Sequence, residues 1–117
     1  MENLKFSYNW NNKLCCRAFT NIRVHNPRRY YTGAKFNIIL QPSKKDSEAQ
    51  NLGSAIVKSI KTFKVSQLND FMSFLDTGYD AEECKKIIAR MYQNLNLDDA
   101  KFDYILFCYD KPPKLYF

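Results

Sequence analysis

The chain has few of the side chains that build metal sites and membrane spans. His25 is its one histidine. No two of its four cysteines have the two-residue spacing of a zinc knuckle. No stretch approaches the run of about 20 apolar residues that a membrane helix needs. We therefore predict no metal, no cofactor and no contact with a membrane.

The N-terminal segment also lacks a long apolar run. Lys5, Asn9 and Asn11 interrupt any stretch that could serve as a secretory signal peptide. Cys84 and Cys108 fall within apolar patterns, as buried thiols do. We therefore expect a cytoplasmic protein whose cysteines are reduced.

Acidic residues are scarce in the first half of the chain. Residues 1–64 contain 12 Lys or Arg and 3 Asp or Glu, whereas residues 65–117 contain 6 and 9. The charges of the two halves are therefore +9 and −3. Basic surfaces attract RNA and DNA by neutralising phosphates, but a soluble protein can be basic without binding either. RNA or a nucleotide is the expected partner, and charge alone leaves both interpretations open.

Alternating apolar and polar residues predict that much of the regular structure is β-strand. Between Ala18 and His25, even-numbered residues share one face and odd-numbered residues share the other. Later the alternation slips, which indicates a bulge or bend beginning near Gly53. The last strand is apolar on both faces, as expected of a central strand covered on both sides. The predicted strands cover residues 4–10, 18–25, 36–40, 52–65 and 102–109.

Two helices are predicted between the last two of these strands. Ser66 is the candidate cap of the first, and Asp80 with Glu83 resembles a capping box at the start of the second. Apolar residues recur at helical spacing in both, and we expect all of them to face the core. They are Leu68, Phe71, Met72 and Leu75 in the first helix and Cys84, Ile87, Ile88 and Met91 in the second.

A chain of 117 residues fits one domain. We predict a single α+β domain over residues 1–117, built as a small bent β-barrel with about two helices packed on it. Residues 41–51 are polar and are expected to form a solvated loop. Residues 111–117 are expected to form a C-terminal tail that packs back on the domain or docks a partner.

Four short motifs give the chain a family resemblance. Asn21-Ile22-Arg23 lies on a strand, Thr32-Gly33 closes the following loop, the residues 53–57 form a later strand, and Gly78-Tyr79-Asp80 precedes a helix. In this order they resemble the ASCH domain of the PUA-like superfamily, over most of residues 13–109. The signature of that family is a Lys, a Thr and an Arg in the arrangement K-x-x-T-x-R, followed by a loop ending in Gly.

The resemblance implies a function in binding RNA or handling nucleosides. Some ASCH relatives resemble amidohydrolases that remove the acetyl group from acetylated cytidine by means of Lys, Thr and Glu. Here Ala18 and Asn21 stand at the Lys and Thr positions, so the reactive amine and hydroxyl are missing there. Thr20 is adjacent, but alternation points it to the opposite face, toward the core. We therefore predict no catalytic residue. Residues that could enter the site instead are Lys13, Cys16, Arg17 and Asp76.

The predicted ligand pocket consists of Lys13, Asn21, Arg23 and Asp76. Arg23 can fork onto a phosphate or a base edge, or it can form an ion pair with Asp76 or another carboxylate that orders the pocket. A basic, aromatic loop carries further nucleic-acid contacts, in which cations neutralise phosphates and a tyrosine stacks on a base. The predicted contact residues are Arg17, Arg28, Arg29, Tyr30, Tyr31 and Lys35, with Tyr30 or Tyr31 as the stacking ring.

Three functional hypotheses follow. The leading one is a non-catalytic RNA- or nucleotide-binding module. An alternative is an amidohydrolase acting on a modified nucleoside such as acetylated cytidine. The third is a protein-interaction module that docks through its aromatic tail, Leu115–Phe117. His25 has no visible partner in the sequence and is interpreted as a surface or loop-packing residue.

Overall fold

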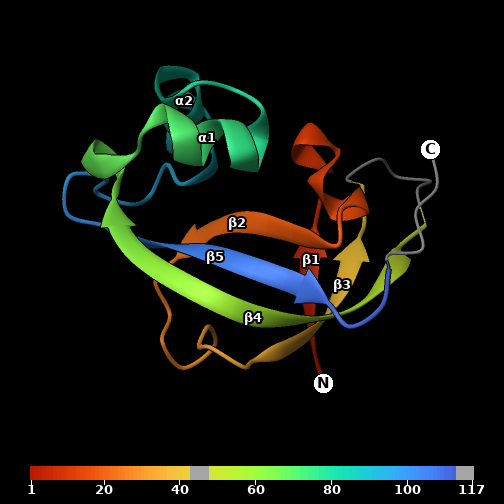
Figure 1. The fold of residues 1–117 in the computed structure, drawn as a ribbon. Helices are drawn as coiled ribbons and strands as arrows, with labels where there is room; N and C mark the ends of the chain where they lie inside the picture. The colour runs from red at the N-terminus through yellow and green to blue at the C-terminus, as the bar shows by residue number, and fades with distance from the viewer. Residues whose placement is uncertain (43–47, 113–117) are drawn as a thin grey trace.

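The structure, a computed structural model, describes residues 1–42 and 48–112 (Figure 1). The middle of the predicted 41–51 loop and most of the predicted tail lie outside the described residues. The described chain forms one mixed five-stranded sheet with two α-helices and two short 3₁₀ helices, which confirms the α+β class. The elements are β1 (Glu2–Phe6), η1 (Trp10–Cys15), β2 (Ala18–Val24), β3 (Lys35–Leu40), β4 (Gln50–Lys64), η2 (Val65–Gln67), α1 (Asp70–Thr77), α2 (Ala81–Met91) and β5 (Lys101–Tyr109).

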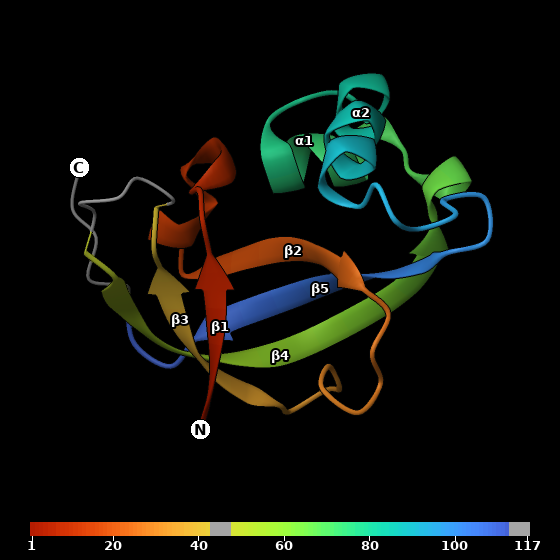
Figure 2. The same cartoon turned by 180° about the vertical axis from the view of Figure 1, so that it is seen from behind.

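The strands lie in the order β1-β3-β4-β5-β2, so β1 and β2 are the two edges. β1 runs parallel to β3, and the other neighbouring pairs are antiparallel. The sheet curves strongly, and β1 stands across the start of β2 (Figure 2). There the rings of Phe6 and Phe19 meet edge to face at 6.0 Å. No backbone ladder joins these edges within the described strands, so the sheet is open and the predicted barrel is not confirmed.

Two register shifts bend β4 where the alternation slips in the sequence. One lies opposite the Ile38–Ile39 step of β3, and the other falls between Val57 and Ser59, against β5. Extra residues of this kind strengthen the local twist of a strand. The predicted bulge near Gly53 is confirmed. β4 begins at Gln50, inside the segment predicted as a loop.

The core is divided into two clusters. The first joins buried residues from all five strands, with Phe36 and Phe107 among its largest side chains. The second joins Phe63 and Phe102 of the sheet to apolar residues of α1 and α2. β5 contributes to both clusters, because Phe102 and Phe107 point to opposite faces. β5 is a central strand, as predicted, but it is not covered along its whole length on both sides, since Leu106 is 38% exposed.

The helices follow the predicted order, with a corrected start for the first. α2 begins as predicted, since the Asp80 side chain accepts a hydrogen bond from Glu83 N at 2.9 Å. α1 begins at Asp70, because the Asn69 side chain caps it by accepting from Met72 N at 2.8 Å. The predicted cap Ser66 lies in η2 instead. None of the described helices has the length and apolarity that crossing a membrane requires.

The prediction that every apolar residue of the helices faces the core is wrong. Met72 is buried, but Phe71 and Leu75 are 77% and 51% exposed, and Met91 at the end of α2 is also exposed. Leu68 precedes α1, so spacing counted from it does not follow one face of that helix. The result is an apolar surface on α1 that faces solvent.

Gly78 allows α1 to pack tightly against η1. Its φ of 81° lies in the left-handed region, which glycine adopts without steric penalty. A Cβ added at Gly78 would lie 3.2 Å from Asn11 Oδ1. The Asn11 side chain in turn donates a hydrogen bond from Nδ2 to Phe74 O at 3.2 Å. This contact places η1 beside the end of α1.

Candidate functional site

Lys13, Thr20 and Asp76 meet where η1, β2 and α1 come together. Lys13 Nζ lies 2.8 Å from Asp76 Oδ1, and Thr20 Oγ1 donates to the same oxygen at 3.1 Å. Lys13 and Asp76 are both almost fully buried. Thr20 is on the face predicted by alternation, but it contacts a carboxylate there as well as the core. This hydroxyl is the site residue that the sequence analysis set aside.

Two hydrogen bonds to the backbone of the next residue, Leu14, fix the turn that carries Lys13. Asn9 Oδ1 accepts from Leu14 N at 2.9 Å, and Tyr109 donates from its hydroxyl to Leu14 O at 3.0 Å. Asn11 and Asn12 have φ of 57° and 52°, a left-handed conformation that asparagine tolerates better than most residues. The lysine is therefore held in place by its own turn rather than by the ion pair alone.

Burial sets the protonation of Lys13. Removal from water lowers the pKa of its ammonium below the ordinary value of 10.5, and this effect exceeds the opposing attraction of Asp76. Arg23 also disfavours the charged form of Lys13, by a smaller amount. The cluster thus presents a buried amine that gives up its proton more readily than a surface lysine does.

Lys13 and Asp76 border a cavity in two adjoining chambers, whereas Thr20 lines neither chamber. The inner chamber has a volume of about 50 Å³ and includes Lys13, Asp76 and Cys84 in its walls. The outer chamber has a volume of about 110 Å³ and includes Arg23 and Tyr8. Five residues line both chambers and lie between them: Trp10, Asn21, Ile22, Met91 and Tyr92.

Arg23 is held at the wall of the outer chamber. Its Nε donates to Asn21 Oδ1, and its Nη2 donates to Lys5 O at 2.8 Å. The guanidinium lies 4.9 Å from the centre of the Phe6 ring. Burial lowers the pKa of Arg23 from its ordinary value. The ordinary value is so high that the guanidinium stays charged. Within the described residues, Nη1 of this guanidinium has no hydrogen-bond partner.

The four predicted pocket residues are thus brought together, but not paired as expected. Asn21 and Arg23 bond to each other at the outer chamber, while Lys13 and Asp76 pair at the inner one. The alternative that Arg23 forms an ion pair with Asp76 is wrong, since Lys13 occupies that carboxylate. Trp10, which the sequence analysis did not select, borders both chambers.

The predicted nucleic-acid residues divide into tied and accessible ones. Tyr30 is buried against Phe36, with ring centres 6.0 Å apart, so its ring is not available for stacking on a base. Arg29 reaches across to β1, where its Nε lies 2.6 Å from Glu2 Oε1. Arg17 donates to the backbone oxygens of the β5 end, at 2.8 and 3.0 Å. The accessible residues are Arg28, Tyr31 and Lys35.

His25 has a partner that the sequence did not reveal. Its Nδ1 lies 2.8 Å from Oδ1 of Asp103, which is 1% exposed on β5. The same oxygen accepts from Thr62 Oγ1 at 2.8 Å, and Asn26 N lies 3.3 Å from the second carboxylate oxygen. This cluster ties β2, β4 and β5 together at one end of the sheet.

Within residues 1–42 and 48–112, no three His, Cys, Asp or Glu side chains are grouped so as to hold a metal ion. Comparison of the chain with family models, curated proteins and solved structures finds no match. The proposals that follow rest on the geometry of the described residues and on the resemblance in their motifs.

Proposed function

We propose that this chain is a non-catalytic RNA- or nucleotide-binding module that takes one base into the two-chamber cavity. The main support is Arg23, whose half-buried guanidinium has an uncommitted Nη1 at the wall of the outer chamber. A guanidinium in this setting can bind a phosphate or the acceptor edge of a base. The ASCH resemblance, with its implied PUA-like barrel, favours the same class of ligand.

The size and walls of the cavity suit a single ring. A protein cavity of about 150 Å³ takes up benzene, and the outer chamber is of the same order at about 110 Å³. Trp10 and Tyr92 supply aromatic surface on which a base can stack. Asn21 commits its oxygen to Arg23 and keeps its amide hydrogens for an acceptor on the ligand. A pyrimidine fits this arrangement better than a purine.

Exposed residues of the basic loop suit the rest of the ligand. Arg28, Tyr31 and Lys35 follow β2 along the chain, and all three are exposed. Cations neutralise phosphates while an exposed tyrosine ring stacks on an unpaired base. We propose that the basic loop holds the backbone of a single strand whose base enters the cavity.

The test is binding of fluorescently labelled single-stranded RNA over a salt series, with two matched variants. Arg23→Gln and Lys61→Gln each remove one positive charge, from the cavity and from exposed β4 respectively. We expect the first to weaken binding by about tenfold and the second to have only a small effect. Absence of binding at low salt, or equal losses in the two variants, would reject the cavity as the binding site.

One observation favours a second candidate, an amidohydrolase acting on a modified nucleoside. The structure places a hydroxyl, a carboxylate and an amine of lowered pKa in one hydrogen-bonded cluster beside the cavity. In this scheme Thr20 Oγ1 attacks the amide carbonyl and passes its proton to Asp76 Oδ1, the oxygen to which it already donates, while the ammonium of Lys13 gives a proton to the leaving amine. Water then releases the acid from the threonine ester.

Incubation with acetylated cytidine, followed by measurement of cytidine and acetate, tests this candidate. The scheme expects turnover that survives Asn21→Ala and disappears in Thr20→Val, which preserves the shape of the side chain. Binding of acetylated cytidine without turnover would leave the non-catalytic proposal in place.

A further inference from the structure

The outer surface of α1 and the turn that follows it are unusually apolar. Phe71, Phe74, Leu75 and Tyr79 are 77%, 49%, 51% and 48% exposed. Aromatic and large aliphatic side chains grouped in this way are typical of surfaces that bind another molecule. None of these side chains lines the cavity between η1, β2 and α2. Tyr79 packs edge to face on Trp10 of the cavity wall, with ring centres 6.1 Å apart, so this surface adjoins the site of the proposed function without lining it.

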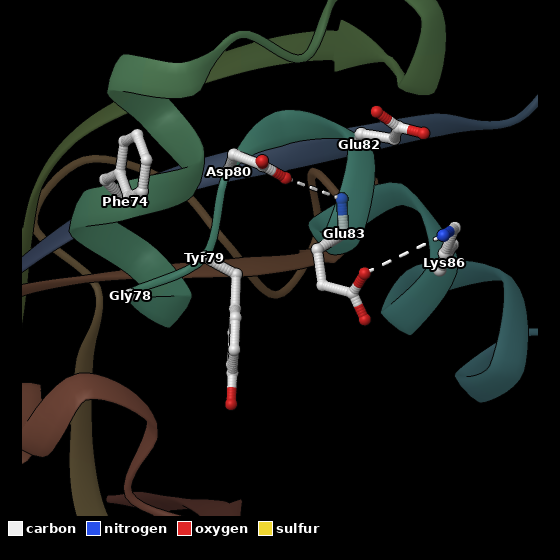
Figure 3. Close-up of a pocket in the computed structure, with 7 residues that line it drawn as sticks. All are labelled: Phe74, Gly78, Tyr79, Asp80, Glu82, Glu83 and Lys86. Carbon is white, nitrogen blue, oxygen red and sulfur yellow. Dashed lines mark hydrogen bonds and ion pairs between the residues drawn. The ribbon is translucent and has the colours of Figure 1, made fainter.

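A groove of about 540 Å³ lies beside this apolar surface (Figure 3). Phe74 of α1 stands on one side of it and Lys86 of α2 on the other, with Tyr79 projecting from the turn between them. One hydrogen bond links the starts of the two helices, since Asp70 Oδ1 accepts from Ala81 N at 2.9 Å. This bond helps to hold the helices that carry the two walls of the groove.

Charge determines what the groove can accept. Asp80, Glu82 and Glu83 line it, against the single cation Lys86, whose Nζ lies 3.8 Å from Glu83 Oε2. These carboxylates repel phosphates, so RNA is not the expected occupant. They attract a segment in which Lys or Arg accompanies an apolar side chain.

We propose that this groove docks a cationic segment of another protein, with its apolar side chains on Phe74 and Tyr79 and its cations on Glu82 and Glu83. A second copy of this chain is the less suitable occupant. A basic surface of one copy placed in the groove of the next would make a head-to-tail contact, and such contacts extend into open chains unless the rotation closes.

The experiment is selection of peptides from a random library displayed on phage, with the full chain as bait. The variant Phe74→Ser/Glu82→Lys serves for counter-selection. We expect the peptides specific for the native chain to carry Lys or Arg next to Leu, Met or an aromatic residue. A selected sequence without basic residues, or no sequence that survives counter-selection, would overturn the proposal.

The best selected peptide is then synthesised and its affinity measured for single variants. We expect Phe74→Ser and Glu82→Lys each to weaken binding by about tenfold. Leu95→Ser and Asp98→Lys make the same changes at exposed residues outside the groove and should leave the affinity within about twofold. Equal losses in these controls would overturn the assignment of the groove.

Two further measurements separate this proposal from its competitors. In sedimentation, a concentration-dependent polymer that Phe74→Ser abolishes would show that a second copy is the occupant and would overturn the proposal. Arg23→Gln should leave the peptide affinity unchanged, and Glu82→Lys should not weaken RNA binding. The proposal about the groove and the proposal about the cavity can therefore be rejected independently of each other.

Discussion

Asp76 and Asp103 are two buried aspartates with the same kinds of partner in different surroundings. Asp76 on α1 accepts from the ammonium of Lys13 and the hydroxyl of Thr20. Asp103 on β5 lies against the imidazole of His25 and accepts from the hydroxyl of Thr62. Each aspartate therefore joins segments that are far apart in the sequence.

The difference between the clusters lies in access. The Asp76 cluster borders a cavity, and its cation is itself buried. Asp103 is enclosed, while its partner His25 has a side chain 37% exposed to solvent. A cluster that borders a cavity can act on a ligand, whereas one whose imidazole faces water mainly holds strands together. The comparison teaches that residue types alone do not distinguish a candidate ligand-binding site from a cluster that only stabilises the fold.

Removing the first aspartate should have the largest effect. Asp76→Ala leaves the buried ammonium of Lys13 without a carboxylate, and such losses amount to about 3–5 kcal/mol of unfolding free energy. Urea unfolding followed by circular dichroism measures it. The double variant Lys13→Met/Asp76→Leu removes both charges and should recover most of the stability. If the double variant is as unstable as Asp76→Ala, burial of an unpaired charge is not the cause.

Removing the second aspartate should have a smaller effect on stability and none on the cavity. Asp103→Ala leaves His25 and Thr62 with access to water, so we expect a loss of about 2–3 kcal/mol from hydrogen bonds to a charged group. Urea unfolding gives this value. The second measurement is RNA binding under conditions in which the variant is fully folded. Loss of RNA binding by a folded Asp103→Ala protein would make the two clusters functionally alike.

Substitutions at two glycines test how much the contact between η1 and the end of α1 contributes to stability. Gly78→Ala meets both a left-handed backbone and Asn11 Oδ1 at 3.2 Å, so we expect a loss of about 1–2 kcal/mol. Gly33 has a φ of 94° but nothing within 4 Å of an added Cβ. The loss of stability in Gly33→Ala therefore comes only from the left-handed backbone. Thermal unfolding of both variants isolates the contact with η1. Equal losses would show that this contact contributes nothing.

The pH dependence of stability should show the smallest effect. The pKa of Lys13 is lowered in the folded chain by burial, so between that lowered value and the ordinary one the unfolded chain binds more protons. Stability contributed by this group therefore rises with pH through that window. We expect native stability, relative to Lys13→Met/Asp76→Leu, to increase from pH 7 to pH 10. A constant difference would show that Lys13 titrates normally.

The strands were predictable because their pattern is local. Alternation or an apolar run indicated every strand, and the slip near Gly53 revealed the bend of β4. The first strand was predicted too far, to residue 10, where η1 begins. The exposure of Phe71 was not predictable, since helical spacing does not tell which residues precede a helix of only two turns. The match between His25 and Asp103 joins residues 78 apart, and no local pattern indicates it.

The candidate site was predicted in its residues but not in their pairing. Lys13, Asn21, Arg23 and Asp76 do gather at one cavity. Alternation gave Thr20 its correct face, but it could not show that α1 presents Asp76 to that face. Side-chain pairing across three elements depends on their packing, which spacing along the chain does not record.

The pairing of β2 has a consequence for how the cavity comes into existence. Within the sheet, residues 18–24 form their ladder with residues 102–108. Asn21 and Arg23 are therefore synthesised well before their partner strand and acquire their final positions only after residues 102–108 have been made. On a ribosome the cavity cannot form until β5 has emerged. A nascent chain lacking that strand should bind no ligand in the cavity, however complete its helices are.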